Sequence, residues 1–316
     1  MKPMLADAGT LPDPEEGWAF EFKWDGVRAI VTVDAEGTVR LSSRLGRDVT
    51  ASYPELHGLG AALAGRSAVL DGEIVALGPG GRPDFGALQK RIHVTDPGRV
   101  RQLAGEVPVS LFLFDLLSLD GTDTSTLPYA ERRDRLEALG LAGPGWATPP
   151  SYRSGGAAVL KVARSQGLEG VVAKRLDRPY RPGRRSGDWR KVKLTRTQEV
   201  VLAGWTPGRG SRQGFRALVL GIPGPGGLAY VGKVGSGFTD DMLDELSARL
   251  RPLRRVDSPL LDLPARAELA GVTWVEPELV GEVSFSEWTA DGHLRHPTWR
   301  GLRPDKLPGQ VGREDR

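Results

Sequence analysis

The pattern of the sequence changes near residue 197, and this change limits the folds open to the chain more than any other feature does. Before it, strand-like segments are mixed with segments of helical spacing. After it, short apolar segments alternate with Gly/Pro turns, and a single amphipathic segment covers 240–253. About five short strands with one helix are typical of a small barrel of the OB-fold type. We therefore predict two domains, 1–196 and 197–316, with the boundary near 195–199.

Periodicity predicts the elements of both domains, and together they indicate an α+β fold. Residues 28–34 and 38–43 flank a short turn and predict a β-hairpin. The other strands predicted in the first domain are 18–24, 67–77, 107–119, 170–175 and 188–194, and its predicted helices are 53–63, 129–139 and 156–166. The strands predicted in the second domain are 199–205, 215–222, 228–235 and 278–288.

The composition excludes several kinds of chemistry. With no cysteine, the chain has no disulfide, no Cys-ligated zinc, no iron–sulfur cluster and no thiol nucleophile. Four histidines leave little for a His-rich metal site. No apolar run approaches the ~18 residues that span a bilayer, and the N-terminus lacks the apolar core of a signal peptide. We expect no membrane contact and a cytoplasmic location.

Positive charge is concentrated in one segment. Between Arg153 and Arg196, thirteen Lys or Arg residues stand against three acids, so this segment carries +10 while the whole chain carries +3. Such a block favours a polyanionic partner, phosphate or nucleic acid, and its loop 178–188 is a candidate for contacts with a phosphate backbone. The alternative is a solvated arginine-rich face.

The octapeptide EFKWDGVR (21–28) is the densest group of chemically active residues. Lys23 is expected at the end of a strand, just before an Asp-Gly turn, where it is held at the rim of a sheet. To act as a nucleophile it must lose its proton, which nearby cations favour. Arg28, Lys191 and Lys193 are candidates for those cations, and a surface lysine beside a turn is the alternative.

The octapeptide resembles the nucleotidyl-transfer motif of the covalent nucleotidyltransferases, which include DNA ligases, RNA ligases and mRNA-capping enzymes. Further segments resemble the other motifs of that superfamily, in the same order along the chain. They are 43–46, 71–73, 114–115, 169–175, 189–193 and 303–306. PMLA at the start, FGALQKRIHV (85–94) and LRHPTWRGLRPDK (294–306) make the chain most similar to the ligase domain of bacterial ATP-dependent DNA ligase D. That family serves non-homologous end joining.

The resemblance implies roles for the matching residues. Lys23 would carry AMP covalently, and Glu21 would accept a hydrogen bond from the adenine amino group. The implied nucleotide-binding residues are Glu21, Arg28, Arg44, Glu73, Phe114, Arg185, Lys191 and Lys193. Glu73 and Glu169 would serve a metal ion, Asp25 belongs to the first motif, and Arg303, Asp305 and Lys306 would act from the OB-fold domain.

General chemistry agrees with these roles, because phosphoryl transfer needs cations on the phosphates and carboxylates on Mg²⁺. Plainer alternatives stand beside each of them. Lys191 and Lys193 would form a solvated basic face, and Glu73 and Glu169 internal salt bridges. The remaining alternatives are a core ring for Phe114, a surface acid for Glu21, a solvated loop arginine for Arg185 and a polar tail for 303–306.

We therefore expect an adenylation (nucleotidyltransferase) domain of antiparallel sheets and flanking helices, followed by an OB-fold β-barrel. The implied function is an ATP-dependent DNA ligase that seals 5′-phosphate/3′-hydroxyl breaks through lysyl-AMP, with ATP and Mg²⁺ or Mn²⁺. The implied partners are nicked or broken double-stranded DNA, the end-binding Ku protein, and separate polymerase and nuclease repair proteins. We expect a nucleoid-associated monomer, either free-standing or excised from a larger ligase D.

Two other classes of function stay open at this point. The first is another enzyme on the same fold, an RNA ligase or a capping guanylyltransferase, which a comparison of ATP with GTP would separate. An NAD-dependent ligase is disfavoured, because its zinc-finger module needs cysteines. The second is a non-catalytic nucleic-acid-binding protein that uses the basic loop and the OB-fold as a strand groove.

Overall fold

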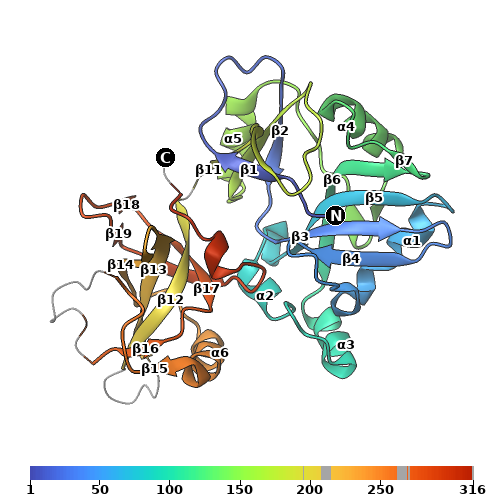
Figure 1. Cartoon of the computed structure of the whole chain (residues 1–316). Coiled ribbons are helices and arrows are strands. Elements are labelled where there is room, and N and C mark those ends of the chain that lie inside the picture. The colour runs from blue at the N-terminus through green and yellow to red at the C-terminus, as the bar shows by residue number, and fades with distance from the viewer. Residues whose placement is uncertain (195, 208–214, 262–268, 270, 315–316) are drawn as a thin grey trace. The chain divides into compact units, whose positions relative to one another are not determined.

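The computed structural model describes residues 1–194, 196–207, 215–261, 269 and 271–314, which fall into two units, Met1–Leu194 and Thr195–Asp315 (Figure 1). None of the described helices is long and apolar enough to cross a bilayer.

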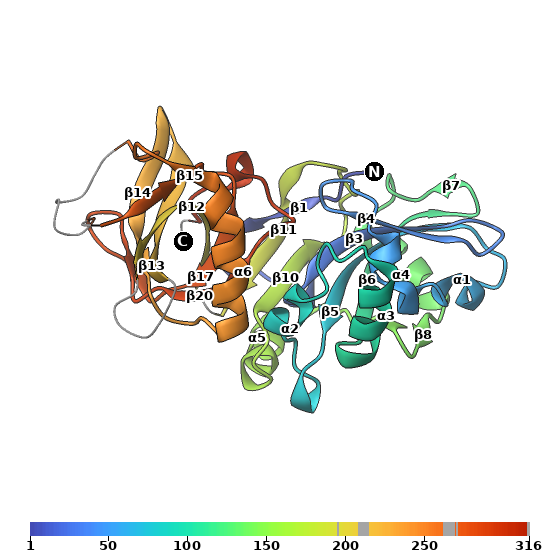
Figure 2. The same ribbon diagram turned by 90° about the horizontal axis from the view of Figure 1, so that it is seen from below.

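A four-stranded sheet in the first unit has one apolar and one polar face. Its order is β1 (Leu5–Ala8), β11 (Arg185–Lys193), β10 (Gly170–Arg175) and β2 (Trp18–Lys23). Alternation sends Phe20, Val171 and Val192 to one face, where they pack against Val159 of helix α5 (Gly156–Ser165). Figure 2 shows α5 beside β10. The other face is left for polar side chains.

The register of this sheet sets its polar side chains in rows across three strands. Lys23 of β2 and Lys193 of β11 both lie opposite Gly170 of β10. Two residues further along β10, Glu21 and Lys191 both lie opposite Val172. Residues directly opposite each other, and residues two apart, share a face of a sheet, so these lysines and Glu21 point the same way.

The second sheet of this unit has the order β4-β3-β5-β6-β9-β8, with β7 paired to β6. Its strands are β3 (Val27–Val33), β4 (Val39–Ser43), β5 (Ala68–Ala76), β6 (Val109–Leu119), β7 (Thr122–Asp123), β8 (Ala142–Gly143) and β9 (Trp146–Ala147). The predicted hairpin is confirmed as β3 and β4. Val31, Leu70 and Leu113 belong to the apolar core on one face, and Arg28, Glu73 and Phe114 alternate away from it.

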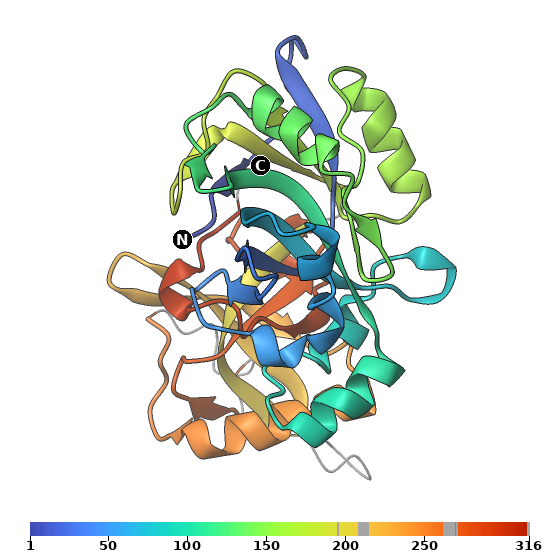
Figure 3. The ribbon, with the colours of Figure 1, turned by 90° about the vertical axis from the view of Figure 1, so that its right-hand side faces the viewer.

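Short helices cover the apolar sides, and α4 packs on β6 (Figure 3). They are α1 (Leu59–Ala62), α2 (Phe85–Gln89), α3 (Pro97–Glu106) and α4 (Tyr129–Ala138), with 3₁₀ turns η1 (Thr50–Ser52), η2 (Pro54–Leu56) and η3 (Pro79–Gly81). The helix predicted over 53–63 is wrong, because η2 and the four-residue α1 replace it. Pro54, Gly58 and Gly60 disfavour a continuous helix. At Gly60 a Cβ would meet the Gly37 carbonyl oxygen at 1.8 Å, so this segment is fitted to the neighbouring turn.

A small cluster joins the two sheets. Met4, Ile30, Leu117, Tyr180 and Trp189 pack together, and Phe114 lies against them. Met4 comes just before β1, Ile30 and Leu117 come from the second sheet, and Trp189 comes from β11. The contact holds the polar face of the first sheet toward the side of the second sheet that carries Arg28 and Glu73.

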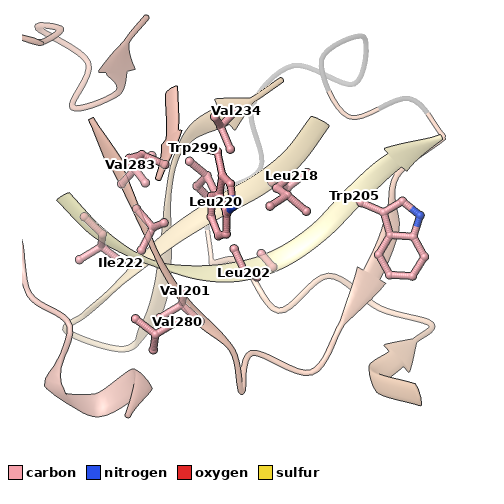
Figure 4. Close-up of a cluster of buried hydrophobic side chains, with 14 of the residues drawn as sticks. Val201, Leu202, Trp205, Leu218, Leu220, Ile222, Val234, Val280, Val283 and Trp299 are labelled. Carbon is pink, nitrogen blue, oxygen red and sulfur yellow. The ribbon is translucent and has the colours of Figure 1, made fainter. Parts of the chain in front are cut away.

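The described part of the second unit consists of a seven-stranded sheet, a separate two-stranded sheet of β18 and β19, and the helix α6. Its elements are β12 (Thr197–Pro207), β13 (Phe215–Gly224), β14 (Gly227–Val234), α6 (Asp240–Leu250), η4 (Arg251–Leu253), β15 (Arg254–Arg255), β16 (Thr273–Val275), β17 (Val280–Ser284), β18 (Glu287–Trp288), β19 (Leu294–Arg295), β20 (Thr298–Leu302) and η5 (Pro308–Gln310). The long strand β12 pairs with β13 along one edge, and with β17 and then β16 along the other. Figure 4 shows its core, which includes Leu202, Leu220 and Trp299.

Three details of the predicted fold need correction. The sheets of the first unit are mixed rather than antiparallel, because β1 pairs in parallel with β11 and β6 with β9. The strand expected at 188–194 begins earlier, at Arg185, because Leu5 and Ala6 of β1 pair with Arg185 and Ser186. Among the described strands of the second unit the pairing does not close into a barrel, so this unit is OB-fold-like.

Gly170 provides a test of this architecture. Its φ is +153°, and a Cβ there would meet the Val192 carbonyl oxygen at 2.0 Å. We expect Gly170→Ala to destabilise the protein by about 1–3 kcal/mol or more. Gly105, exposed in α3 with nothing within 4 Å of an added Cβ, is the matched control. There, Ala should stabilise by about 0.5–1 kcal/mol. Urea unfolding of both variants measures the difference, and equal stabilities would contradict this account.

Candidate active site

Lys23, Lys193 and Glu169 meet at one end of the polar face. Glu169 directly precedes β10, so its carboxylate reaches the lysines that flank Gly170. It pairs with Lys23, and its Oε1 lies 3.7 Å from Lys193 Nζ. Glu169 is 5% exposed, whereas the Lys23 side chain keeps 23% of its surface. The Lys23 side chain therefore contacts a proton acceptor and stays partly exposed.

The contact of Glu169 with Lys23 and Lys193 bears on the two alternatives for Glu169, a residue of the site or an internal salt bridge. Glu169 does form an internal ion pair, as its plainer alternative supposes, but both partners are residues of the predicted site. Lys193, one of the cations proposed to activate Lys23, shares this carboxylate with it. Arg28 is bound by a different acid.

Arg28 is held by Asp71 in a two-pronged ion pair. Its Nε lies 2.5 Å from Oδ1 and its Nη2 lies 2.6 Å from Oδ2. Tyr180 donates its hydroxyl to the same carboxylate at 2.6 Å. Burial lowers the pKa of the Arg28 guanidinium, but Asp71 raises it more, and the net shift is upward. Arg28 is therefore a fixed cation, 4.6 Å from the centre of the Phe114 ring.

Glu21 is a buried carboxylate with several donors. Tyr129 donates its hydroxyl to Oε1, and Lys174 Nζ donates to Oε2 at 2.8 Å. Arg133 Nη1 lies 3.8 Å from Oε1. With 6% exposure, Glu21 is not the surface acid that its plainer alternative supposes.

Phe114 lies where an aromatic ring can serve a ligand and the core at once. Strict alternation along 112–115 predicts Phe112 and Phe114 on one face of β6 and Asp115 on the other, and the second part is wrong. A bulge between Leu113 and Asp115 places Asp115 opposite Asp71, on the side away from the apolar core, where it is buried and pairs with Arg132. Phe114 is half-buried and meets the edge of Trp189 at 6.4 Å between centroids.

The other predicted residues of this unit are placed as follows. Glu73 is half-buried on β5, opposite Arg28 of β3. Asp25 and Arg44 lie half-buried in the turns after β2 and β4. The described residues contain no group of three or more His, Cys, Asp or Glu that could hold a metal ion by themselves. Mg²⁺ usually takes one or two protein carboxylates together with substrate phosphates, so the metal-binding role expected for Glu73 and Glu169 stays a prediction.

The arginine-rich segment is exposed. Arg185 lies at the start of β11, and its Nη1 donates to the Ala6 carbonyl at 2.7 Å. In the preceding loop, Arg181 Nε lies 3.2 Å from Asp188 Oδ2. Arg184 is exposed as well. Lys191 is half-buried on the same face as Lys193.

Within the second unit, the segment 303–306 is not a polar tail, because Asp305 and Lys306 are buried and Arg303 is half-buried. Arg303 pairs with Asp305 at 2.8 Å and with Glu282 at 3.1 Å. Lys306, which is 6% exposed, pairs with Glu199. Burial raises the pKa of Glu199, but Lys306 and Arg303 lower it more, and the net shift is downward.

The geometry brings Lys23, the buried carboxylate of Glu169 and further cations together at one end of the polar face. Comparison with known proteins agrees. Residues 3–193 match the ATP dependent DNA ligase domain family, and residues 211–306 match the ATP dependent DNA ligase C terminal region. The chain belongs to the ATP-dependent DNA ligase family.

Within this family, the chain is similar to the LigD proteins of several bacteria. The multifunctional non-homologous end joining protein LigD of Mycolicibacterium smegmatis is 46% identical over 98% of this chain and 39% of its own length. LigD of Pseudomonas aeruginosa is 41% identical over 98% of this chain and 36% of its own length. The chain thus spans about two fifths of these relatives. A structure of mycobacterial DNA ligase D complexed with ATP and MES matches with a TM-score of 0.73 at 44% identity, covering 99% of this chain and 98% of that one.

The sequence did not single out several residues that complete the site. Tyr129, Arg133 and Tyr180 help to hold the predicted residues in place, and Asp71 and Lys174 were noted only as parts of the motifs 71–73 and 169–175. One signal was available for Lys174, because it is two residues from Val172 on an alternating strand and so faces the same side as Lys191. The others depend on contacts between segments far apart in the chain.

The ion pairs of Glu199 with Lys306 and Arg303 predict that the stability of the second unit depends on pH. The pKa of Glu199 is lower in the folded protein, so its ionised form stabilises the fold above the unfolded pKa of about 4.3. This contribution is lost as pH falls further, through the folded pKa. At pH 7, Glu199→Gln should destabilise the second unit by roughly 1–3 kcal/mol. The gap in melting temperature between wild type and Glu199→Gln should therefore shrink from pH 7 to pH 3. A gap that stays constant would contradict the argument.

Proposed function

We propose that this chain is an ATP-dependent DNA ligase that seals 5′-phosphate/3′-hydroxyl breaks through a lysyl-AMP intermediate on Lys23. The observation that carries the proposal is the contact between Lys23 and Glu169 at the end of the polar face, with Lys193 beside it. Family membership and the matched structure with ATP support it. The two units take the roles of adenylation domain and OB-fold domain.

The proposed reaction has three steps. The neutral amine of Lys23 attacks the α-phosphorus of ATP, a nitrogen–phosphorus bond forms, and pyrophosphate leaves. Glu169 contacts the amine and can accept its proton. AMP then passes from Lys23 to the 5′-phosphate at the break. Finally the 3′-hydroxyl attacks that phosphate, which forms the phosphodiester and releases AMP.

The remaining site residues serve the nucleotide. Glu21 faces the adenine amino group, and Phe114 stacks on the base. Lys191 and Lys193 hold the phosphates, with Arg44 and Arg185. The set agrees with a reaction that depends on positioning and charge neutralisation. Arg28 lies beside Phe114, which suits a contact with the nucleoside.

A divalent cation completes the proposed chemistry. Glu73 and Glu169 would hold Mg²⁺ or Mn²⁺, which would neutralise charge on the phosphates. Asp25, from the same motif as Lys23, lies in the turn directly after it. Arg303, Asp305 and Lys306 would act on the departing pyrophosphate, which assigns them to the first step only.

The proposed substrate is nicked or broken double-stranded DNA in end joining, because the LigD relatives are named for that process. Ku and separate polymerase and nuclease proteins are the proposed partners of a monomeric, nucleoid-associated chain. An RNA ligase activity would appear as preferential sealing of RNA strands at a nick.

Covalent labelling tests the nucleophile. After incubation with ATP and Mg²⁺, the intact mass of the wild type should rise by one AMP. Lys23→Ala should show no adduct, because the acceptor nitrogen is gone, and its melting temperature should change little. Lys161→Ala, an exposed lysine of α5, is the control and should label normally. An adduct on Lys23→Ala would end the assignment.

Salt dependence tests the DNA interface. Affinity for a nicked duplex should fall steeply with salt, because bound arginines release counterions. Replacing Arg181 and Arg184 by Ala should flatten the slope of log K against log salt by about 0.9 for each phosphate that is no longer neutralised. Arg249→Ala, on α6 and paired with Glu245, is the control that should leave the slope unchanged. A slope unaffected by the loop changes would refute this interface.

A further inference from the structure

The carboxylate of Glu21 is surrounded by two hydrogen-bond donors and a further cation. Three groups from two elements surround its carboxylate: Tyr129 and Arg133 of α4, and Lys174 of β10. Each oxygen receives one hydrogen bond, Oε1 from Tyr129 and Oε2 from Lys174. A carboxylate oxygen can accept about two, so each keeps room for one more donor.

Lys174 is held in an unusually specific environment. It is 1% exposed, and its ammonium lies 4.3 Å from the ring centre of Trp189, 4.6 Å from that of Phe114 and 4.9 Å from that of Tyr129. It also donates to the Phe114 carbonyl at 3.3 Å. Ring faces attract cations, and Glu21 supplies the opposite charge. The ammonium is therefore fixed between Glu21 and the ring proposed to stack on the base.

Arg133 places positive charge near Glu21 without donating a hydrogen bond to it. Its Nε pairs with Glu137 at 2.7 Å and its Nη2 donates to the Pro149 carbonyl. Its buried Nη1 has no hydrogen-bond partner among the described residues and stands 3.8 Å from Glu21 Oε1. Burial and then Glu21 raise the pKa of Tyr129 well above its ordinary value, so its hydroxyl stays a donor.

We propose that Lys174, Tyr129 and Arg133 are positioning residues that set the nucleobase specificity of this site, by holding Glu21 as a fixed carboxylate that can only accept hydrogen bonds. The inference rests on the proposed function, because it takes Glu21 as the partner of the base. It adds residues that select the base without touching it.

The chemistry of the purine 6-position explains the selection. Adenine carries an amino group there, which donates to a carboxylate. Hypoxanthine and guanine carry a carbonyl oxygen, which would face the carboxylate lone pairs and leave both groups unsatisfied. A carboxylate that lost these partners would be free to turn away from the base, which would weaken the preference for the amino group.

The experiment compares ATP with ITP, which has a carbonyl at the 6-position and no 2-amino group. The measured quantity is the ratio of kcat/KM for lysyl-nucleotide formation with the two nucleotides, followed by intact mass. Wild type should prefer ATP strongly. Lys174→Met should reduce the ATP/ITP ratio about tenfold or more, mainly through a higher KM for ATP. Lys174→Arg, which keeps charge and donors, should restore much of the ratio.

Arg175→Met is the matched control. Arg175 is the next residue on β10, lies on the opposite face and pairs with exposed Asp177, so its replacement should leave the ratio unchanged. If Lys174→Met does not fold, Tyr129→Phe tests the same inference by removing the donor to Oε1, and the ratio should fall several-fold.

The outcomes separate this inference from the proposed function. A wild type that takes no AMP would refute the proposed function itself. A wild type that takes AMP and discriminates, with an unchanged ratio in folded Lys174→Met or in Tyr129→Phe, would overturn the inference alone. An equal fall in Arg175→Met would overturn it as well, because the effect would not be specific to Glu21.

Discussion

The pairing of β2 and β11 on the two sides of β10 is the constraint on which the site depends. It sets Lys23 and Lys193 on either side of Gly170, and Glu21 and Lys191 two residues further along β10 on the same face. Because successive side chains of a strand alternate between faces, a shift of one residue in this register would turn the lysines into the apolar core. Phe20, Val171 and Val192 prevent that shift, since they fill the opposite face against α5. The hydrophobic core of this sheet therefore fixes the positions of the charged groups.

Buried ion pairs then fix the orientation of individual side chains. In each of three pairs, at least one of the two side chains is almost fully buried. The pairs are Arg28 with Asp71, Arg132 with Asp115, and Lys174 with Glu21. Such pairs contribute little net stability, because desolvation opposes the attraction between the charges. Their geometry is specific, however, and each of these pairs includes or adjoins a residue proposed to meet the nucleotide. We infer that they serve the precision of the site more than the stability of the fold.

Local patterns were sufficient for much of the fold. The strands around Lys23, Glu73 and Phe114 and the helices α4 and α5 were predictable, because alternation and helical spacing depend only on neighbouring residues. The 53–63 segment was not, because close backbone approach at Gly60 decides its path. The early start of β11 also escaped prediction, since it depends on pairing with Leu5 and Ala6. These differences arise where a partner distant in the sequence changes the local preference.

The residues and their order define the chemistry available to this protein: a lysine at the end of a strand, carboxylates on or beside apolar strands, a basic segment, and the order of motifs that indicates a ligase. Which of these groups meet depends on how the sheets and helices pack. This packing pairs Glu169 with Lys23 and Lys193, directs Arg28 to Asp71, and surrounds Glu21 with Tyr129, Arg133 and Lys174. The physical reason is that a buried charge must find a partner, and the nearest partner is set by how the sheets and helices pack rather than by distance along the chain.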